Sequence, residues 1–314
     1  MCNMVSICIP TYNRSDLLVR AVQSAIHQTY QDIEILISDN CSLNEHWQKI
    51  KEIAKLDNRI VLRRNEVNIG FAGNLNVCID VANGEFILFL CDDDELLPTI
   101  IEKEVQLFKK DSQIGLIHTD GFDCGIKTLQ RKVNYPEILK AGDAAIEKIF
   151  LEMTIFFSST ITRKKVYDEL GYFTITSSPD WEMCARVSKK YDIGFINEPL
   201  VNMYGHTVSR RNPAEYDDEV SLLKDQILSY YNDSSKKIKL KTYSFKQDGL
   251  MYMSLGYHAF KECNYILGYK YLATAYPHIG FFLFLKQLLI IGLKLPFATF
   301  KYNIASKKMN HTNV

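Results

Sequence analysis

The sequence predicts an α/β fold in which a mostly parallel, doubly wound sheet is followed by a helical C-terminal extension. Short apolar runs of strand length alternate with helical patterns over about the first 120 residues, which is the spacing of βαβ units. The run at residues 86–90 is apolar throughout, as expected of a strand that is covered on both faces. Beyond residue 213 the pattern is helical to the end.

The elements of the first half follow from apolar periodicity and from turn residues. Pro10 closes the first strand, and Ser15 or Asp16 can cap the helix that follows. In order, we expect a strand at residues 5–9, a helix at 17–26, a strand at 33–37, a helix at 47–55, a strand at 60–62, a helix between the turn at 68–73 and residues 83–84, a strand at 85–90, a helix at 98–110 and a strand at 115–119.

The pattern changes after residue 120, and residues 121–140 look irregular. We then expect a helix at 143–152, a strand at 156–162, a helix at 163–170 that Gly171 ends, a helix from an acidic turn at 177–182 to residue 191, and a strand at 193–196. We therefore divide the chain into a first domain at residues 1–212 and a helical region at residues 213–314.

Composition excludes several classes of protein. Hydrophobic residues make up 47% of the 314, which argues against disorder. Lys plus Arg and Asp plus Glu are both 37, so there is no basic excess and we expect no nucleic-acid partner. The 8 cysteines include no CxxC pair, which argues against a zinc knuckle. We expect a cytoplasmic protein without a secretory signal.

Four consecutive acidic residues, Asp92 to Glu95, follow the apolar run at residues 86–90. Open α/β sheets bind ligands beyond the carboxyl ends of their strands, so these carboxylates are expected at a binding site. A divalent cation that carries a diphosphate would balance their charge. The alternative is an acidic first turn of the next helix, since Pro98 suits a helix start.

The sequence is not typical of a dinucleotide-binding unit. The first strand-to-helix turn has no G-x-G-x-x-G, and nothing matches a P-loop. A bound nucleotide would therefore have its phosphates held by a metal and by side chains.

Six short motifs follow one another between about residues 4 and 210. They are the stretch at residues 5–13, the loop at 37–42, Asn68-x-Gly70 with Asn76 and Gly84-Glu85, Asp92-Asp93-Asp94, Asp180-Trp181-Glu182 with Arg186, and Tyr204-Gly205-His206. Together they resemble the inverting family 2 glycosyltransferases of the GT-A fold, of the type that builds bacterial surface polysaccharides.

The resemblance implies a nucleotide-sugar site at the first motifs. Pro10, Thr11, Tyr12 and Asp39 resemble the positions that hold the base and ribose of a nucleoside diphosphate, and Asn68 belongs to the same donor site. The alternative for Asp39 is a loop residue that makes an Asx-turn.

The resemblance also implies a metal site for Mn²⁺ or Mg²⁺. Asp92 resembles the residue that contacts the ribose, whereas Asp93 resembles a metal ligand, with Asp94 as the third member of the motif. Cys91 stands where many members have the first Asp of the motif. His206 resembles a histidine that adds a ligand in some members, which would favour Mn²⁺; the alternative is a structural histidine.

Asp180 matches the family's general base, which takes the proton of the acceptor hydroxyl as that hydroxyl attacks C1 of the sugar. The alternative is that Asp180 caps the following helix, with Glu182 in its first turn. Trp181 is expected to pack on a sugar or in the core, and Arg186 to form an ion pair. Arg210, with its neighbour in sequence, would clamp the diphosphate; a solvated loop is the alternative.

The stretch at residues 280–300 is strongly apolar, but Lys286, Lys294 and Lys301 interrupt it and Pro296 would kink it. A helix that lies in the membrane plane fits this pattern better than a spanning one. The alternative is a helix that covers the core. The first reading places the protein at the inner face of the cytoplasmic membrane.

The resemblance therefore implies an inverting, metal-dependent hexosyl- or N-acetylhexosaminyltransferase. It would move a sugar from a UDP-sugar to a hydroxyl of a growing, lipid-linked cell-surface glycan. One alternative is a nucleotidyltransferase, although the turn at residues 10–14 lacks the glycines and lysines of its phosphate loop. The other alternative is a non-catalytic scaffold of the same fold. The presence of all three acidic motif residues argues against it: Asp39, Asp93 and Asp180.

Overall fold

The computed structural model describes residues 3–124, 129–131, 135–152, 155–173, 178–204, 213–261 and 264–309. The chain divides into two compact units: Met1–Val208 with Gln226–Asn232, and Ser209–Asp225 with Asp233–Val314. The domain boundary expected at residue 212 stays a prediction, since the first unit includes a short segment from beyond it.

The first unit is built on one mixed sheet. Its strands are β1 (Val5–Thr11), β2 (Ile33–Asp39), β3 (Ile60–Arg64), β4 (Phe86–Phe89), β5 (Glu95–Leu96), β6 (Ile114–Asp123), β7 (Leu129–Arg131), β8 (Ile138–Leu139), β9 (Thr160–Arg163) and β10 (Asp192–Met203). The order is β3-β2-β1-β4-β9-β6-β10-β5, with β7 on β6 and β8 on β10. Strands β1 to β4 pair in parallel, as do β6 and β10, whereas β9 is antiparallel to both its neighbours.

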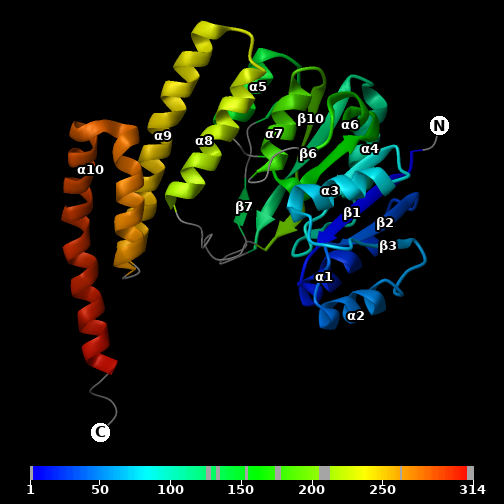
Figure 1. Ribbon diagram of the computed structural model, residues 1–314, viewed down its shortest axis with the longest axis horizontal. Helices are drawn as coiled ribbons and strands as arrows, with labels where there is room; N and C mark the ends of the chain where they lie inside the picture. The colour runs from blue at the N-terminus through cyan, green and yellow to red at the C-terminus, as the bar shows by residue number, and fades with distance from the viewer. Residues whose placement is uncertain are drawn as a thin grey trace. The chain divides into compact units, whose positions relative to one another are not determined.

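Helices cover both faces of this sheet. Figure 1 shows α1 (Ser15–Ile26) and α2 (Asn44–Ile53) on one face and α3 (Gly70–Val81) on the other. The further helices of the unit are α4 (Ile100–Lys110), α5 (Asp143–Glu152), a 3-10 turn at Phe157–Ser159, α6 (Lys164–Leu170) and α7 (Pro179–Ser188).

Strands β1 and β2 are buried at every position, as predicted for parallel strands that are covered on both faces. Ile7 and Ile9 belong to the same core cluster as Leu18 of α1. Thr11 at the end of β1 lies beside Asp39 at the end of β2. The loops that follow these strands therefore meet at one edge of the sheet, which is where such folds bind ligands.

The structure differs from the sequence prediction where partners are distant along the chain. Strand β6 continues past the expected end at residue 119 to Asp123, because the extension pairs with β7 and β10. Helix α1 begins at Ser15, but the side chain of Ser15 does not cap it: Oγ lies 2.9 Å from Nδ1 of His46. The strand expected at residues 156–162 begins as the 3-10 turn and becomes strand only at Thr160.

Gly84 has a structural role at the opposite edge of the sheet. Its N–H donates to Ser6 Oγ at 2.9 Å, and the Asn83 N–H donates to Glu34 Oε1 at 2.6 Å. A Cβ on Gly84 would lie 2.7 Å from the Ser6 nitrogen, which no side chain tolerates. This turn thus aligns β4 with β1.

The segment at residues 226–232, which includes the end of α8 (Pro213–Ser229), belongs to the first unit. The Tyr231 hydroxyl donates to Glu147 at 3.0 Å, and the Asn232 side-chain amide donates to Asp143 at 3.1 Å. These contacts fasten the segment to α5.

The second unit is helical, as expected beyond residue 213. Helices α9 (Ser234–Lys261) and α10 (Tyr265–Met309) pack through a cluster that includes Tyr252, Phe260 and Leu272. The backbone of α10 departs from helical geometry at Gly280, with φ +70°, rather than at Pro296, because glycine accepts a positive φ without strain. Over the part of the chain that the structure describes, no helix has both the length and the apolarity that a membrane crossing requires.

Candidate active site

A cleft of about 560 Å³ opens at the carboxyl ends of β1 and β4 and beside the start of α3, within the size range of small-molecule sites. Its lining combines the predicted donor-site residues with others that the motifs did not single out as ligand contacts. The first group is Pro10, Thr11, Tyr12, Asn68, Asp92 and Asp93; the second is Arg14, Asn40, Gly70, Phe71, Asn74 and Cys91.

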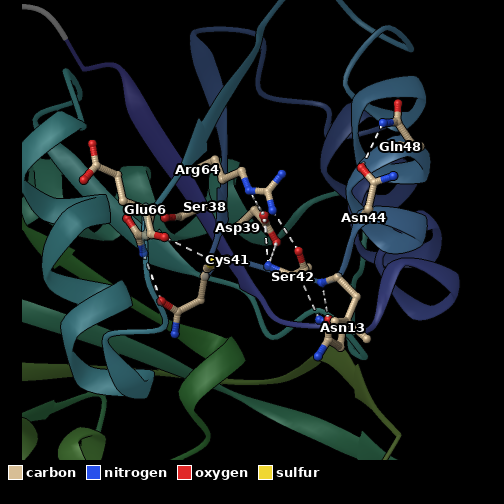
Figure 2. Close-up of polar contacts among 12 residues, drawn as sticks. Asn13, Ser38, Asp39, Cys41, Ser42, Asn44, Gln48, Arg64 and Glu66 are labelled. Atoms are coloured by element: carbon tan, nitrogen blue, oxygen red, sulfur yellow. Dashed lines mark hydrogen bonds and ion pairs between the residues drawn. The ribbon is translucent and has the colours of Figure 1, made fainter.

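Asp39 lies beneath this cleft rather than in its lining. It is fully buried, its carboxylate accepts from the Ser42 N–H at 3.3 Å, and the Arg64 Nε lies 3.3 Å from Oδ2 (Figure 2). Arg64 also donates to the Ser42 carbonyl at 2.8 Å. Asp39 therefore holds the loop after β2 through the N–H three residues on, one residue further than in an Asx-turn, and its contact with a nucleotide base stays a prediction.

An amide network holds the loop before α3 against the loop after β2. The Asn40 side-chain amide donates to Asn68 Oδ1 at 2.9 Å and to the Gly70 carbonyl at 3.1 Å. Asn65 donates to Asn40 Oδ1 at 3.1 Å and to Asn74 Oδ1 at 2.9 Å. Asn40 and Asn74 are buried, and their hydrogen bonds with the more exposed Asn65 and Asn68 fix the shape of this wall of the cleft.

The acidic run is joined to the end of β1. The Thr11 hydroxyl donates to Asp92 Oδ2 at 2.8 Å. One guanidinium, that of Arg14, bridges the run, with Nη1 2.9 Å from Asp92 Oδ1 and Nη2 2.5 Å from Asp93 Oδ2. Arg20 donates to the Asp93 backbone carbonyl. Two cations thus offset the repulsion among these carboxylates.

Asp94 is turned toward the protein interior. Its carboxylate accepts from the Ser158 hydroxyl at 2.5 Å and from the Tyr204 N–H at 3.1 Å. Burial raises the pKa of the Asp94 carboxyl, and the Asp93 charge adds to this, against the two hydrogen bonds. Burial, together with the Asp94 charge, also raises the pKa of the Cys91 thiol well above its usual range.

Among the described residues, Cys91, Asp93 and Asp94 offer ligand atoms that lie within 4.8 Å of one another. The two carboxylates are the hard oxygen donors that Mg²⁺ and Mn²⁺ prefer, so this donor set fits such an ion. His206 and Arg210, together with the neighbouring Arg211, lie outside the described residues, so their predicted roles stay predictions.

Asp180 lies in the first turn of α7. It lines a small hollow of about 10 Å³ with Phe157 and Met183, rather than the large cleft. Burial raises the pKa of its carboxyl, against hydrogen bonds from backbone N–H groups at the start of the helix. A carboxylate held in such surroundings takes a proton more readily than an exposed one.

The neighbours of Asp180 in the motif have structural roles. Trp181 is buried and its indole N–H donates to the Ile149 carbonyl at 3.0 Å, so it belongs to the core. Arg186 forms the expected ion pair, with Glu182 at 2.9 Å. It also donates to the Leu170 carbonyl at 2.6 Å, at the end of α6.

Sequence reasoning missed Arg14, Asn40, Phe71 and Asn74 as parts of this cleft. The signal for the amides was present, because asparagines are frequent in the loops that follow β2 and β3. The signal for Arg14 was absent, since its pairing with Asp93 joins residues 79 positions apart.

Comparison with known proteins places these features in a family. The model of the family described as glycosyl transferase family 2 matches residues 6–171. The chain is 31% identical over 156 residues to Escherichia coli WfaP, a UDP-Glc:alpha-D-GlcNAc-diphosphoundecaprenol beta-1,3-glucosyltransferase. That match covers 48% of this chain and 61% of WfaP, so the chain spans about three fifths of that relative.

Two further relatives align with a shorter and a longer part of this chain. Identity is 40% over 94 residues, 30% of each chain, with the Campylobacter jejuni GalNAc(5)-diNAcBac-PP-undecaprenol beta-1,3-glucosyltransferase. An uncharacterized glycosyltransferase of Haemophilus influenzae is 26% identical over 242 residues, which cover 73% of this chain and 75% of that one.

Solved structures share the fold. S. aureus TarS in complex with UDP-GlcNAc superposes with a TM-score of 0.62 at 16% identity, over 76% of this chain and 71% of TarS. The mannosyltransferase PcManGT of Pyrobaculum calidifontis, in complex with GDP-Man and Mn2+, gives 0.56 at 15% identity, over 93% and 80%. These likenesses confirm the predicted GT-A fold class.

Proposed function

The chain belongs to glycosyl transferase family 2, and from this we propose that it transfers a sugar from a UDP-sugar, with inversion, to a hydroxyl of a growing, lipid-linked cell-surface glycan. The observation that carries the proposal is the cleft at the ends of β1 and β4. It brings the Pro10–Tyr12 turn, the Asn68 loop and the acidic run to one cavity, although they are far apart in sequence. The relatives whose names contain diphosphoundecaprenol or PP-undecaprenol support a lipid-linked acceptor.

In this proposal the cleft holds the nucleoside diphosphate. Tyr12 at the mouth is 44% exposed and free to lie against the base, while Asp39 supports the loop behind it. Asp92 receives the ribose, and its bond to Thr11 keeps it facing the cleft. Asp93 and Asp94 would hold Mn²⁺ or Mg²⁺, and the ion would supply positive charge that stabilises the departing diphosphate.

Asp180 is the proposed general base. Its carboxylate takes the proton from the acceptor hydroxyl while the oxygen of that hydroxyl attacks C1 of the donor sugar from the face opposite the diphosphate. The C–O bond to the diphosphate breaks as the new glycosidic bond forms, which inverts the configuration at C1. The surroundings that raise the pKa of Asp180 make it the stronger base.

A lipid-linked acceptor would require the protein to work at a membrane surface, for which we propose the inner face of the cytoplasmic membrane. Residues 280–300 within α10 carry the apolar side chains and the lysines that suit a helix in the membrane plane. This helix would keep the protein close to a lipid-linked glycan.

A panel of nucleotide sugars, scored with Mn²⁺ for release of free nucleoside diphosphate, tests the donor half of the proposal without an acceptor. One donor should be hydrolysed above the rest, and the Asp93→Asn variant should lose that activity by at least a hundredfold. Release of pyrophosphate from a nucleoside triphosphate and a sugar 1-phosphate, supplied in place of the nucleotide sugar, would instead identify a nucleotidyltransferase. Binding of UDP without turnover of any donor, in the presence of a lipid-linked acceptor, would identify a scaffold.

A further inference from the structure

Arg14 occupies a special position in the cleft. It is the residue that precedes α1, and it lines the cleft together with the two carboxylates that it binds. Its side chain is 36% exposed, whereas those of Asp92 and Asp93 are only 5% and 13% exposed. The guanidinium therefore pairs with both carboxylates and is the most exposed of the three side chains.

The two terminal nitrogens of the Arg14 guanidinium form ion pairs with different carboxylates. Nη1 lies 2.9 Å from Asp92 and Nη2 lies 2.5 Å from Asp93. These are the carboxylates that the proposed function assigns to the ribose and to the metal. One side chain thus contacts both carboxylates to which the proposed function assigns a ligand.

We propose that Arg14 is a built-in counter-ion of the donor site, which pairs with Asp92 and Asp93 in the ligand-free protein and releases them when a divalent cation and a nucleoside diphosphate bind together. After release, the guanidinium pairs with the phosphates. This inference rests on the proposed function, because the ligand class is taken from it.

The charge of Arg14 is permanent. Burial acts to lower the pKa of the guanidinium, but the Asp92 and Asp93 carboxylates outweigh it and the net shift is upward. A divalent cation that binds alone must therefore displace the guanidinium from these two carboxylates. A diphosphate offers the guanidinium a new site, since guanidinium groups bind phosphate oxygens in bidentate fashion.

The backbone at Arg14 is held in place, so the exchange needs only a change of side-chain rotamer. The N–H of the preceding residue, Asn13, donates to Ser42 Oγ at 2.8 Å, and Asn13 Oδ1 accepts from the Leu43 N–H at 2.7 Å (Figure 2). The Arg14 backbone carbonyl accepts the first hydrogen bonds of α1, from Leu17 at 3.0 Å and Leu18 at 3.2 Å.

The exchange couples the two ligands. Nucleotide that engages Arg14 frees the carboxylates and so raises metal affinity, and by linkage metal raises nucleotide affinity by the same factor. Removal of Arg14 should weaken this coupling. The metal alone should then bind more tightly, while the factor by which each ligand raises the affinity of the other should fall.

Arg20 provides a matched control. It lies on α1 and brings a positive charge to the same acidic run, but it donates to the backbone carbonyl of Asp93 rather than to a carboxylate. Its guanidinium is packed 3.6 Å from the centre of the Tyr204 ring. Arg20→Gln removes a nearby charge without freeing a ligand atom.

The test is a titration of the full chain with Mn²⁺ alone, with free Mn²⁺ measured by electron paramagnetic resonance. We expect Arg14→Gln to bind Mn²⁺ about tenfold more tightly than wild type, and Arg20→Gln to change the affinity about twofold at most. Equal affinity in wild type and Arg14→Gln overturns the proposal. An equal rise in both variants also overturns it, because general electrostatics would then account for the effect.

Repeating the titration with saturating UDP separates this inference from the proposed function. We expect UDP to raise Mn²⁺ affinity more in wild type than in Arg14→Gln, and equal enhancement in both contradicts the release of Arg14 to the phosphates. If UDP has no effect on wild type, the proposed function fails, while the titration with Mn²⁺ alone still decides whether Arg14 competes with the metal.

A second variant, Arg14→Lys, tests the proposal if Arg14→Gln does not fold. Arg14→Lys keeps the charge, but a single ammonium does not bridge two carboxylates as a guanidinium does. It should bind Mn²⁺ more tightly than wild type, and wild-type affinity in folded Arg14→Lys contradicts the proposal.

Discussion

The ring of Phe157 packs edge-on against the ring of Phe71, with their centroids 5.9 Å apart. Phe71 lines the large cleft, and Phe157 lines the small hollow beside Asp180. The pair thus connects the cavity proposed for the donor with the carboxylate proposed as base. Phe157 is also stacked on Phe89 of β4, at 5.3 Å, which fixes it to the sheet.

Phe71 should matter for the donor more than for stability. Its side chain is 47% exposed in the cleft, so Phe71→Ala removes a contact surface for the ligand without leaving a cavity in the core. We expect the donor KM to rise about tenfold and the melting temperature to change by about a degree or less. Val67→Ala is the control, because Val67 is exposed in the loop before α3 and lies outside the cleft lining. An unchanged KM in Phe71→Ala would remove Phe71 from the donor site.

Asp180→Asn should separate binding from chemistry. The amide keeps the shape of the side chain but accepts no proton, so kcat should fall about 10²- to 10⁴-fold while UDP affinity stays the same. The raised pKa of Asp180 implies that the carboxylate protonates at a higher pH than usual. On acidification, kcat/KM should therefore fall at a pH above the ordinary value of 3.8. Asp168→Asn, on the exposed side of α6, is the control; full activity in Asp180→Asn would place the base elsewhere.

Glu104 should make stability depend on pH. It is fully buried on α4, and neither of its carboxyl oxygens has a hydrogen-bond partner among the described residues. Burial raises its pKa well above the model-compound value of 4.5. The folded protein therefore holds a proton that the unfolded chain releases, so the stabilising effect is complete below pH 4.5 and is lost as the pH rises toward the folded-state pKa.

Glu104→Gln removes this dependence. The variant should melt a few degrees higher than wild type at pH 8 and show a smaller difference at pH 5, as measured by calorimetry. Glu102→Gln, an exposed change on the same helix, is the control. A Glu104→Gln variant that is less stable than wild type at pH 8 would show that the carboxylate is ionised and compensated.

The membrane hypothesis can be tested at the bend of α10. Truncation after Gly280 removes the apolar stretch with its lysines but keeps Tyr252, Phe260 and Leu272, which pack α9 against the first part of α10. The truncated chain should stay folded by circular dichroism and should no longer sediment with anionic vesicles. Vesicles of neutral lipid, which lack the attraction to lysine, should bind the full chain less tightly. If the truncated chain still sediments, the stretch at residues 280–300 is not the anchor.

Local pattern was sufficient for the part of the fold that positions the site. The apolar runs of β1, β2 and β4, and the polar residues directly after them, are visible in sequence because buried parallel strands are apolar on both faces. The position of Asp92 to Asp94 after a buried strand could be predicted for the same reason, while their roles stay predictions.

The rest could not be predicted, because it depends on partners that are distant along the chain. The extension of β6 to Asp123 requires β10 beside it, and the bridge from Arg14 to Asp92 requires β1 beside β4. For Asp39, the position at a strand end suggested a ligand contact, which stays a prediction. Its burial and its pairing with Arg64 could not be predicted from the sequence, because Arg64 is on a different strand.

The contacts of Tyr231 and Asn232 with α5 also bear on how the protein is made. The N-terminus of a chain leaves the ribosome first, and domains generally fold as they emerge. Here the unit that contains the cleft still lacks a segment when residue 212 leaves the exit tunnel, because residues 226–232 belong to it. Its completion must therefore wait for the start of the helical region, so that the two parts of the chain are linked during biosynthesis as well as in sequence.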